Sequence, residues 1–219
     1  MANTIELRKF YSEALDEVYK LASLTSVLDG DNALVKEGAN ANELLIPKLD
    51  SDGLDDYSRQ TGFVNGSVNF AYETKKIAYD RGRMFSVDAL DEQEATPVFS
   101  ALSAQFVRTK VVPELDTYRL GQYATKAGAS VAAAIADSKA ATKAISLAKS
   151  TIKDAEANIA TTYLFLNPTI KAMIDDLDTT ASRAALEGWA GVIEVPSSRF
   201  FKSIALQHGS FKGTTAVNF

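Results

Sequence analysis

Residues 68–79 read Val-Asn-Phe-Ala-Tyr-Glu-Thr-Lys-Lys-Ile-Ala-Tyr, and this stretch decides how the chain is organised. From Val68 to Lys75, large apolar or β-branched side chains alternate with mostly polar ones, which is the period of a half-buried strand. The apolar positions then shift to Ile77 and Tyr79, so we expect a β-bulge at the two lysines between them. A strand of twelve residues would span about 40 Å, which is long beside the usual five or six residues.

A second strand is predicted at residues 42–49, with Pro47 at a sheet edge or strand end because proline cannot donate to a ladder. Residues 50–66 between the two strands are rich in Asp, Ser, Asn and Gly, and cannot build a core. A lone two-stranded hairpin is marginal in water. We therefore expect this hairpin to bury its apolar face on another subunit, with polar contacts at its tip.

Helical periodicity marks two further segments. Residues 5–21 predict an amphipathic helix, which is marginal alone and must lie on its own body or on a neighbour. Thr96 and Pro97 predict the start of a longer helix that runs to about residue 120. Pro113 should kink or restart this helix, because it removes a backbone hydrogen bond.

The rest of the chain mixes helices and strands. Residues 127–157 are Ala-rich with a helical apolar stripe, so we expect a helix packed closely on a sheet. The elements expected after it are a buried strand at 163–166, a helix opened by Asn167-Pro168, and strands at 191–195 and 204–206. An arm, a hairpin, a long helix and a mixed part in this order predict an α+β fold.

Composition excludes several classes of site. The 219 residues include no cysteine and one histidine, so disulfides, thiol catalysis, Cys-ligated zinc and multi-His metal sites are excluded. His208 lies beside Gly209, and we interpret it as a surface residue in a turn. The net charge of −5 argues against a dedicated nucleic-acid binder. No apolar run approaches the ~20 residues of a membrane helix, and the first residues do not form a signal peptide.

Two charged clusters have more than one interpretation. Asp50-Ser-Asp-Gly-Leu-Asp-Asp56 has a calcium-like pattern, but Gly53 and Thr61 stand at the wrong positions for an EF-hand, so we favour a solvated acidic loop. Asp80-Arg-Gly-Arg83 is either a solvated turn or a salt-bridge node between elements or subunits. The sequence predicts no catalytic residue, no cofactor and no metal site.

A series of short motifs runs through nearly the whole chain. In order they are Gly38-Ala-Asn-Ala-Asn42, Ile46-Pro-Lys48, Asp52-Gly-Leu-Asp-Asp-Tyr-Ser-Arg59, Asp80-Arg-Gly-Arg-Met-Phe-Ser-Val-Asp88, Phe106-Val-Arg108, Val111-Val-Pro-Glu-Leu-Asp116, Leu164-Phe-Leu-Asn-Pro168 and Ile193-Glu-Val-Pro-Ser-Ser-Arg-Phe200. None is specific alone. Together they resemble the major capsid proteins of tailed bacteriophages of Gram-positive hosts, which have the Hong Kong 97-like capsid fold also found in encapsulin shells.

The resemblance implies four regions. Residues 1–37 correspond to an N-arm, 38–80 to an extended hairpin loop, 81–125 to a peripheral domain with a spine helix, and 126–219 to an α/β axial domain. Capsid proteins of this family continue past the position of Phe219, so the C-terminal part of the fold is expected to be missing.

The resemblance also implies a structural function without catalysis. The expected partners are copies of the chain in pentamers and hexamers, a separate scaffolding protein and a portal, around DNA that is enclosed without sequence-specific binding. The expected location is the virion, after synthesis in the bacterial cytoplasm and without a membrane. The residues expected at subunit contacts are Asp52, Tyr57, Arg59, Val68, Phe70, Tyr72, Arg81 and Arg83.

The alternative is a small soluble α+β enzyme or binding module with an unrecognised site. The long hairpin distinguishes the two hypotheses, because a compact enzyme has little use for an unsupported hairpin. The loop 50–66 contains no lysine, so we do not expect the covalent lysine crosslinks that some relatives form there.

Overall fold

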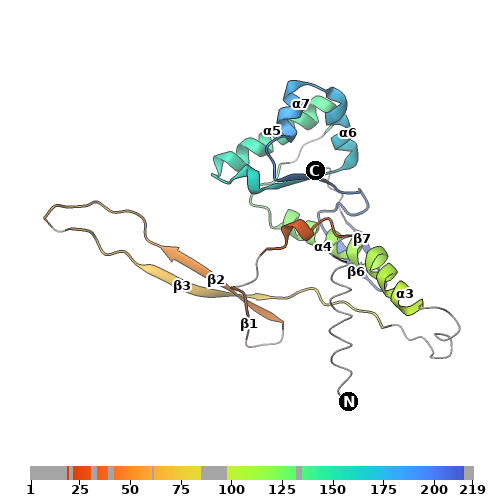
Figure 1. Cartoon of the computed structure of the whole chain (residues 1–219), viewed down its shortest axis with the longest axis horizontal. Coiled ribbons are helices and arrows are strands. Elements are labelled where there is room, and N and C mark those ends of the chain that lie inside the picture. The colour runs from red at the N-terminus through yellow and green to blue at the C-terminus, as the bar shows by residue number, and fades with distance from the viewer. Residues whose placement is uncertain are drawn as a thin grey trace, which may run out of the picture. The chain divides into compact units, whose positions relative to one another are not determined.

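The computed structural model describes residues 19, 22–30, 34–38, 42–60, 62–84, 98–131 and 135–214. These residues form a mixed α+β structure, as expected. The chain separates into two compact units, residues 29–88 and residues 1–28 with 89–219 (Figure 1). The predicted helix at 5–21 lies outside the described residues except for Tyr19, which is helical, and the predicted helix start at Thr96-Pro97 lies outside them entirely.

The unit of residues 29–88 contains a three-stranded antiparallel sheet. Its strands are β1 (Lys36–Glu37), β2 (Glu43–Ser51) and β3 (Val68–Lys76), in the order β1-β2-β3. The two strands of the predicted hairpin are confirmed. The short β1 was not expected, and it gives the base of the hairpin the third strand that an isolated hairpin needs.

The predicted β-bulge is wrong. Pairing between β2 and β3 runs without interruption to the two lysines, with Leu44 opposite Lys75 and Glu43 opposite Lys76. The strand then ends, after nine residues instead of twelve. The apolar positions shift at Ile77 because the strand is over, and no extra residue is inserted.

The long helix of the other unit changes its hydrogen-bonding pattern just before Pro113. It consists of α3 (Val98–Phe106), a π-helical segment (Val107–Val111) and α4 (Val112–Thr125). The amide of Val112 donates to the carbonyl of Val107, five residues back. Pro113 has no amide hydrogen to donate, so a restart at this point is physically expected, and the predicted restart is confirmed.

The mixed part of this unit contains α5 (Ser138–Asp154), β4 (Tyr163–Leu166), α6 (Pro168–Leu177), α7 (Thr180–Leu186) and β5 (Gly191–Glu194). Strands β4 and β5 are parallel, and α6 and α7 form the crossover between them. Parallel strands need such a connection. A short 3-10 turn, Ile159–Thr161, precedes β4.

Side-chain caps fix where these helices begin. Asp137 accepts from the amide of Ala140 at the start of α5, at 2.7 Å. Asn167 does the same for α6, accepting from the amide of Thr169 at 3.0 Å, which confirms the predicted start at Asn167-Pro168. Such caps satisfy amides that have no partner within the helix.

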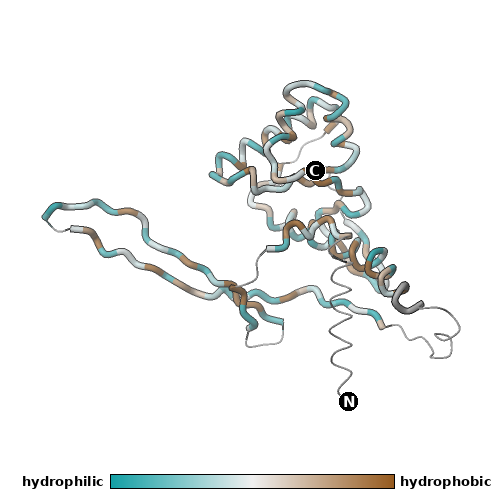
Figure 2. The backbone as a smooth tube through the Cα atoms, viewed as in Figure 1, coloured by the Kyte–Doolittle hydropathy of each residue, from teal (hydrophilic) through white to brown (hydrophobic). Residues whose placement is uncertain are grey.

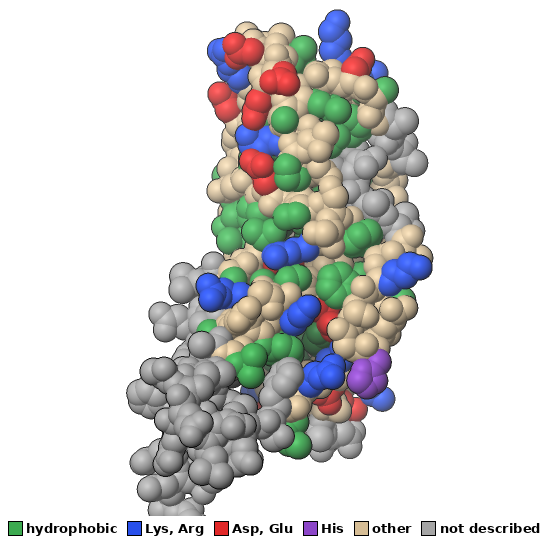
Figure 3. All heavy atoms as spheres, turned by 90° about the vertical axis from the view of Figure 1, so that its right-hand side faces the viewer, with side chains coloured by type: hydrophobic (Ala, Val, Ile, Leu, Met, Phe, Trp, Pro, Cys, Tyr) green, Lys and Arg blue, Asp and Glu red, His purple; other side chains and the backbone are tan. Residues whose placement is uncertain are grey.

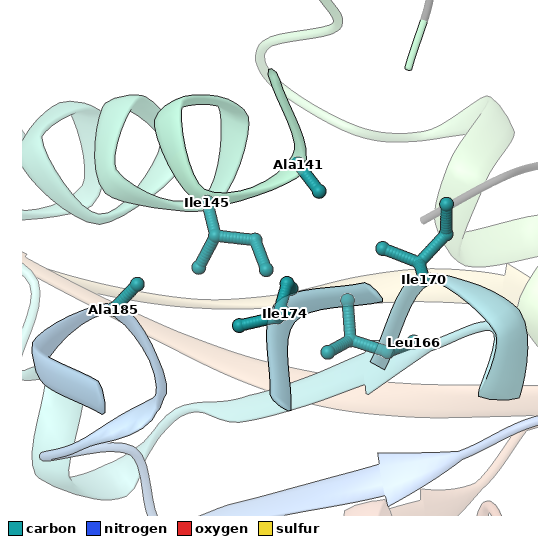
Figure 4. Close-up of a cluster of buried hydrophobic side chains, with 6 residues drawn as sticks. All are labelled: Ala141, Ile145, Leu166, Ile170, Ile174 and Ala185. Carbon is teal, nitrogen blue, oxygen red and sulfur yellow. The ribbon is translucent and has the colours of Figure 1, made fainter. Parts of the chain in front are cut away.

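A buried cluster joins the helices to β4. Its members are Ala141, Ile145, Leu166, Ile170, Ile174 and Ala185 (Figure 4). The expected stripe of α5 is confirmed at its two buried positions. However, α5 packs mainly on α6 and α7 rather than on a sheet, and Leu166 of β4 lies in the same cluster.

The last described elements form a small hairpin, β6 (Ile204–Gln207) and β7 (Ser210–Gly213), beside α4. Strand β6 was predicted and β7 was not. His208 and Gly209 form the turn, where Gly209 has φ +75°, and the exposure of His208 confirms its assignment as a surface residue. Gly121 of α4 faces the chain just before β6, and a Cβ there would lie at van der Waals distance, 3.4 Å, from the carbonyl oxygen of Lys202.

Candidate assembly surface

The β2–β3 hairpin has two faces of different chemistry. Residues directly opposite each other in an antiparallel pair point to the same side of the sheet. Leu49 is opposite Phe70, and Pro47 is opposite Tyr72. One side, which we call the apolar face, therefore carries Leu45, Pro47, Leu49, Val68, Phe70 and Tyr72.

The apolar face is open to solvent. Leu49 is 70 % exposed and Phe70 is 57 % exposed. The rings of Phe70 and Tyr72 meet edge to face with centroids 5.2 Å apart, and Lys36 Nζ of β1 lies 5.1 Å from the Tyr72 ring centroid. Figure 2 shows hydrophobic and hydrophilic segments alternating along this hairpin. Large apolar side chains gathered in one exposed patch mark an interaction surface.

The opposite side of the hairpin carries most of its charges, on Lys48, Asp50, Glu73 and Lys75. Lys75 Nζ donates to Glu73 Oε1 at 2.5 Å. This hydrogen bond and the charge of Lys75 hold the pKa of Glu73 below its ordinary value, and Lys48 adds to the effect. Ion pairs of this kind suit a surface that stays in water.

The loop between the strands is closed at its base and apolar at its tip. The backbone amide of Ser67 donates to Asp52 Oδ2 at 2.6 Å, and the amide of Asp52 donates to the carbonyl of Ser67 at 3.1 Å. Beyond this closure, the rings of Tyr57 and Phe63 lie 4.9 Å apart, and Phe63 is 86 % exposed. The tip therefore offers apolar as well as polar groups, whereas the sequence analysis expected polar contacts alone.

The expected contact residues fall into three places. Val68, Phe70 and Tyr72 lie together on the apolar face. Asp52, Tyr57 and Arg59 belong to the loop at the far end of the hairpin, and Arg81 and Arg83 follow β3 in exposed chain without regular structure. The structure thus brings together the three aromatic and aliphatic residues of β3, but not the charged ones.

The sequence analysis missed the half of the apolar face that β2 provides. Leu45 and Pro47 stand beside Leu44 and Ile46, which are also apolar, so the sequence of β2 does not show which of them share a side. Their side is defined only by the register with β3. A register of one residue more or less would have placed them on the other face. The available signal was limited to Leu49, which stands between Lys48 and Asp50.

A second polar site, which was not predicted, lies in the other unit. Asp116 on α4 is 0 % exposed and accepts hydrogen bonds from the segment 23–25. The donors are Ser23 Oγ (2.6 Å), Thr25 Oγ1 (2.7 Å), Leu24 N (3.0 Å) and Thr25 N (3.3 Å). Arg199 Nη1 lies 3.6 Å from the same carboxylate. We call this arrangement the Asp116 clasp.

The clasp attaches the end of the N-terminal segment to α4. Leu24, between the two hydroxyl residues, packs on a buried cluster of Leu120, Val195 and Phe200. The 3-10 turn Ser26–Leu28 follows directly and ends the first stretch of this unit, since the hairpin unit begins at Asp29. A buried carboxylate needs several donors or a cation, and the clasp supplies both.

The sequence matches no protein-family model, and neither a curated protein nor a solved structure is significantly similar to the chain. Among the described residues, no three His, Asp or Glu side chains lie close enough to hold a metal ion. No helix in the described ranges combines the length and apolar character needed to cross a membrane.

Proposed function

We propose that this chain is a structural capsid protein of a tailed bacteriophage, which assembles with copies of itself into an icosahedral shell around DNA. The support is the ordered series of capsid-like motifs in the sequence together with the open apolar face of the hairpin. The proposed fold is the Hong Kong 97-like fold. In it the helix α3–α4 corresponds to the spine helix, and residues 29–88 include the extended loop.

The observation that carries this proposal is the exposure of the apolar face. Every residue of β3 is exposed, although Val68, Phe70 and Tyr72 are large and apolar. Burying such a side chain is worth ~1.5–3 kcal/mol. In a closed shell each subunit would bury this face on a neighbour and gain that free energy, whereas a monomer gains none of it.

The two-sided chemistry of the hairpin also favours assembly over a folding defect. The charged side carries the Glu73–Lys75 ion pair and stays compatible with water. A strand pair that lies on a neighbouring subunit needs one apolar side that contacts the neighbour and one polar side that faces solvent. A self-contained enzyme or binding module would fill the apolar side with its own residues.

The test is association of the 219-residue chain, measured by light scattering after size exclusion across a wide concentration range, with negative-stain microscopy. We expect concentration-dependent rings, shells or smaller oligomers. Phe70→Ser with Tyr72→Ser should abolish them, and the matched pair Asn69→Ser with Glu73→Ser, on the other side of the same strand, should not. A strictly monomeric chain, or equal effects of the two pairs, would overturn the proposal.

A further inference from the structure

Charge is unevenly distributed over the chain, although its net value is −5. In residues 98–131 and 198–214, which form α3, α4 and the β6–β7 hairpin, the only acidic residues are Glu114 and Asp116. Asp116 is buried in the clasp and cannot offset charge at the surface. The same two stretches contain Arg108, Lys110, Arg119, Lys126, Arg199, Lys202 and Lys212.

Three exposed lysines lie at the end of α4 and on the small hairpin packed beside it. Lys126 follows the last residue of α4, and Thr125 Oγ1 donates to the carbonyl of Lys202 at 3.2 Å. Lys212 lies on β7, opposite Ala205 of β6. We call these three lysines the basic surface. Figure 3 shows several Lys and Arg side chains near the histidine, His208, with a few acidic side chains beside them, and a further group of acidic side chains toward the end formed by α5–α7.

Among the residues that the structure describes, the cations of the basic surface have no acidic partner. Within the described part of the chain, none of Lys126, Lys202 and Lys212 forms an ion pair. By contrast, Lys171 near the acidic end is paired with Asp175 at 2.6 Å, and this hydrogen bond raises the pKa of Lys171. Unpaired cations on one part of a surface attract a polyanion, and its binding releases counterions.

The chemistry around the lysines favours nucleic acid over an acidic protein. Tyr123, one turn before Lys126 on α4, is 50 % exposed, and an exposed ring beside cations is a feature of nucleic-acid surfaces. Protein interfaces are organised around a well-packed apolar or aromatic centre. In residues 98–131 and 198–214 the described large apolar residues that stand exposed are Tyr123, Val131 and Leu206, too few for such a centre.

We propose that the basic surface binds the phosphate backbone of nucleic acid without reading its sequence. Lysine ammonium groups contact phosphates as point charges and carry no base-specific pattern. Such binding goes beyond assembly and agrees with the expectation that DNA is enclosed without sequence-specific contacts. It also explains why a chain with acidic net charge can approach DNA, since the surface and not the sum of charges decides the contact.

The test is fluorescence anisotropy of the unassembled 219-residue chain with two ~30-base-pair duplexes of unrelated sequence, titrated from ~50 mM salt upward. We expect equal affinity for both duplexes. In the variant K126Q/K202Q/K212Q, the slope of log affinity against log salt should fall by about one for each lysine removed. The matched variant K139Q/K143Q/K153Q on α5 removes the same charge elsewhere and should leave the slope unchanged.

Three results would overturn the proposal. If the chain does not bind DNA at the lowest salt, or if the two triple variants lose equal affinity for DNA, the basic surface is not a nucleic-acid site. Unequal affinity for the duplexes would mean that bases are read. Binding of polyglutamate as strong as that of DNA would assign the surface to an acidic protein partner. Because the assay needs no assembly, its failure leaves the shell proposal standing.

Discussion

The hydroxyl of Ser23 donates a hydrogen bond of 2.6 Å to the carboxylate of Asp116, although the two residues are 93 positions apart in the chain. This contact brings the end of the N-terminal segment onto α4. It also explains why a charged residue occupies a fully buried position on that helix, since three neighbouring donors from residues 24 and 25 share the same carboxylate.

The clasp should contribute strongly to the stability of its unit. Asp116→Asn removes the charge and turns amide hydrogens toward buried donors, so we expect a loss of about 2–4 kcal/mol in the free energy of unfolding. Urea denaturation followed by the fluorescence of Trp189, the only tryptophan, measures it. The matched change Asp178→Asn breaks an exposed pair with Arg183 and should cost less than about 1 kcal/mol. Equal losses in the two variants would show that the clasp is not a buried network.

The core of α5–α7 gives a prediction with a control on the same helix. Ile145 is buried in the central cluster, and Ile145→Ala should cost about 2–5 kcal/mol because it leaves a cavity. Leu147 lies two residues further along α5 and is exposed, so Leu147→Ala should lower the free energy of unfolding by less than about 1 kcal/mol. Thermal or urea denaturation compares the two, and a larger loss for Leu147→Ala would contradict the packing.

The charged side of the hairpin predicts the direction of a titration. Because Lys75 holds the pKa of Glu73 below its ordinary value, the carboxyl should stay ionised to lower pH than a free glutamate. Any stability from this pair is present above the ordinary glutamate pKa and disappears as the pH falls through the lowered value. Carbon NMR of Glu73 measures the titration. Lys75→Gln should raise the midpoint, Lys76→Gln should not, and the opposite order would contradict the pairing.

Local sequence patterns predicted most of the elements but not their long-range contacts. Alternation in residues 68–75 identified β3, and Asn167-Pro168 identified the start of α6, because both signals lie within a few residues of the structure they specify. The bulge was predicted wrongly because a shift in apolar parity looks the same at a bulge and at a strand end. The capped helix α7 was missed, since its capping box pairs Thr179 with Ser182 rather than with the usual Glu or Gln.

The candidate surfaces depended on information that one sequence does not hold. The apolar face needs the register between β2 and β3. The basic surface combines Lys126, which follows α4, with lysines more than 70 positions later in the chain. Burial of Asp116 could not be inferred either, because a charged residue on an amphipathic helix is normally taken for a solvated one.

Hydrogen exchange of residues 50–72 tests the central claim most directly. These residues include the loop and the first half of β3, which face solvent in the single chain. We expect their amides to exchange quickly in the dissociated subunit and slowly after assembly, while those of α5–α7 stay protected in both. Deleting residues 51–65 should leave α5–α7 folded and abolish assembly. If the amides of residues 50–72 are already protected in a monomer, or stay unprotected in an assembled particle, the hairpin does not bind a neighbouring subunit and the account is contradicted.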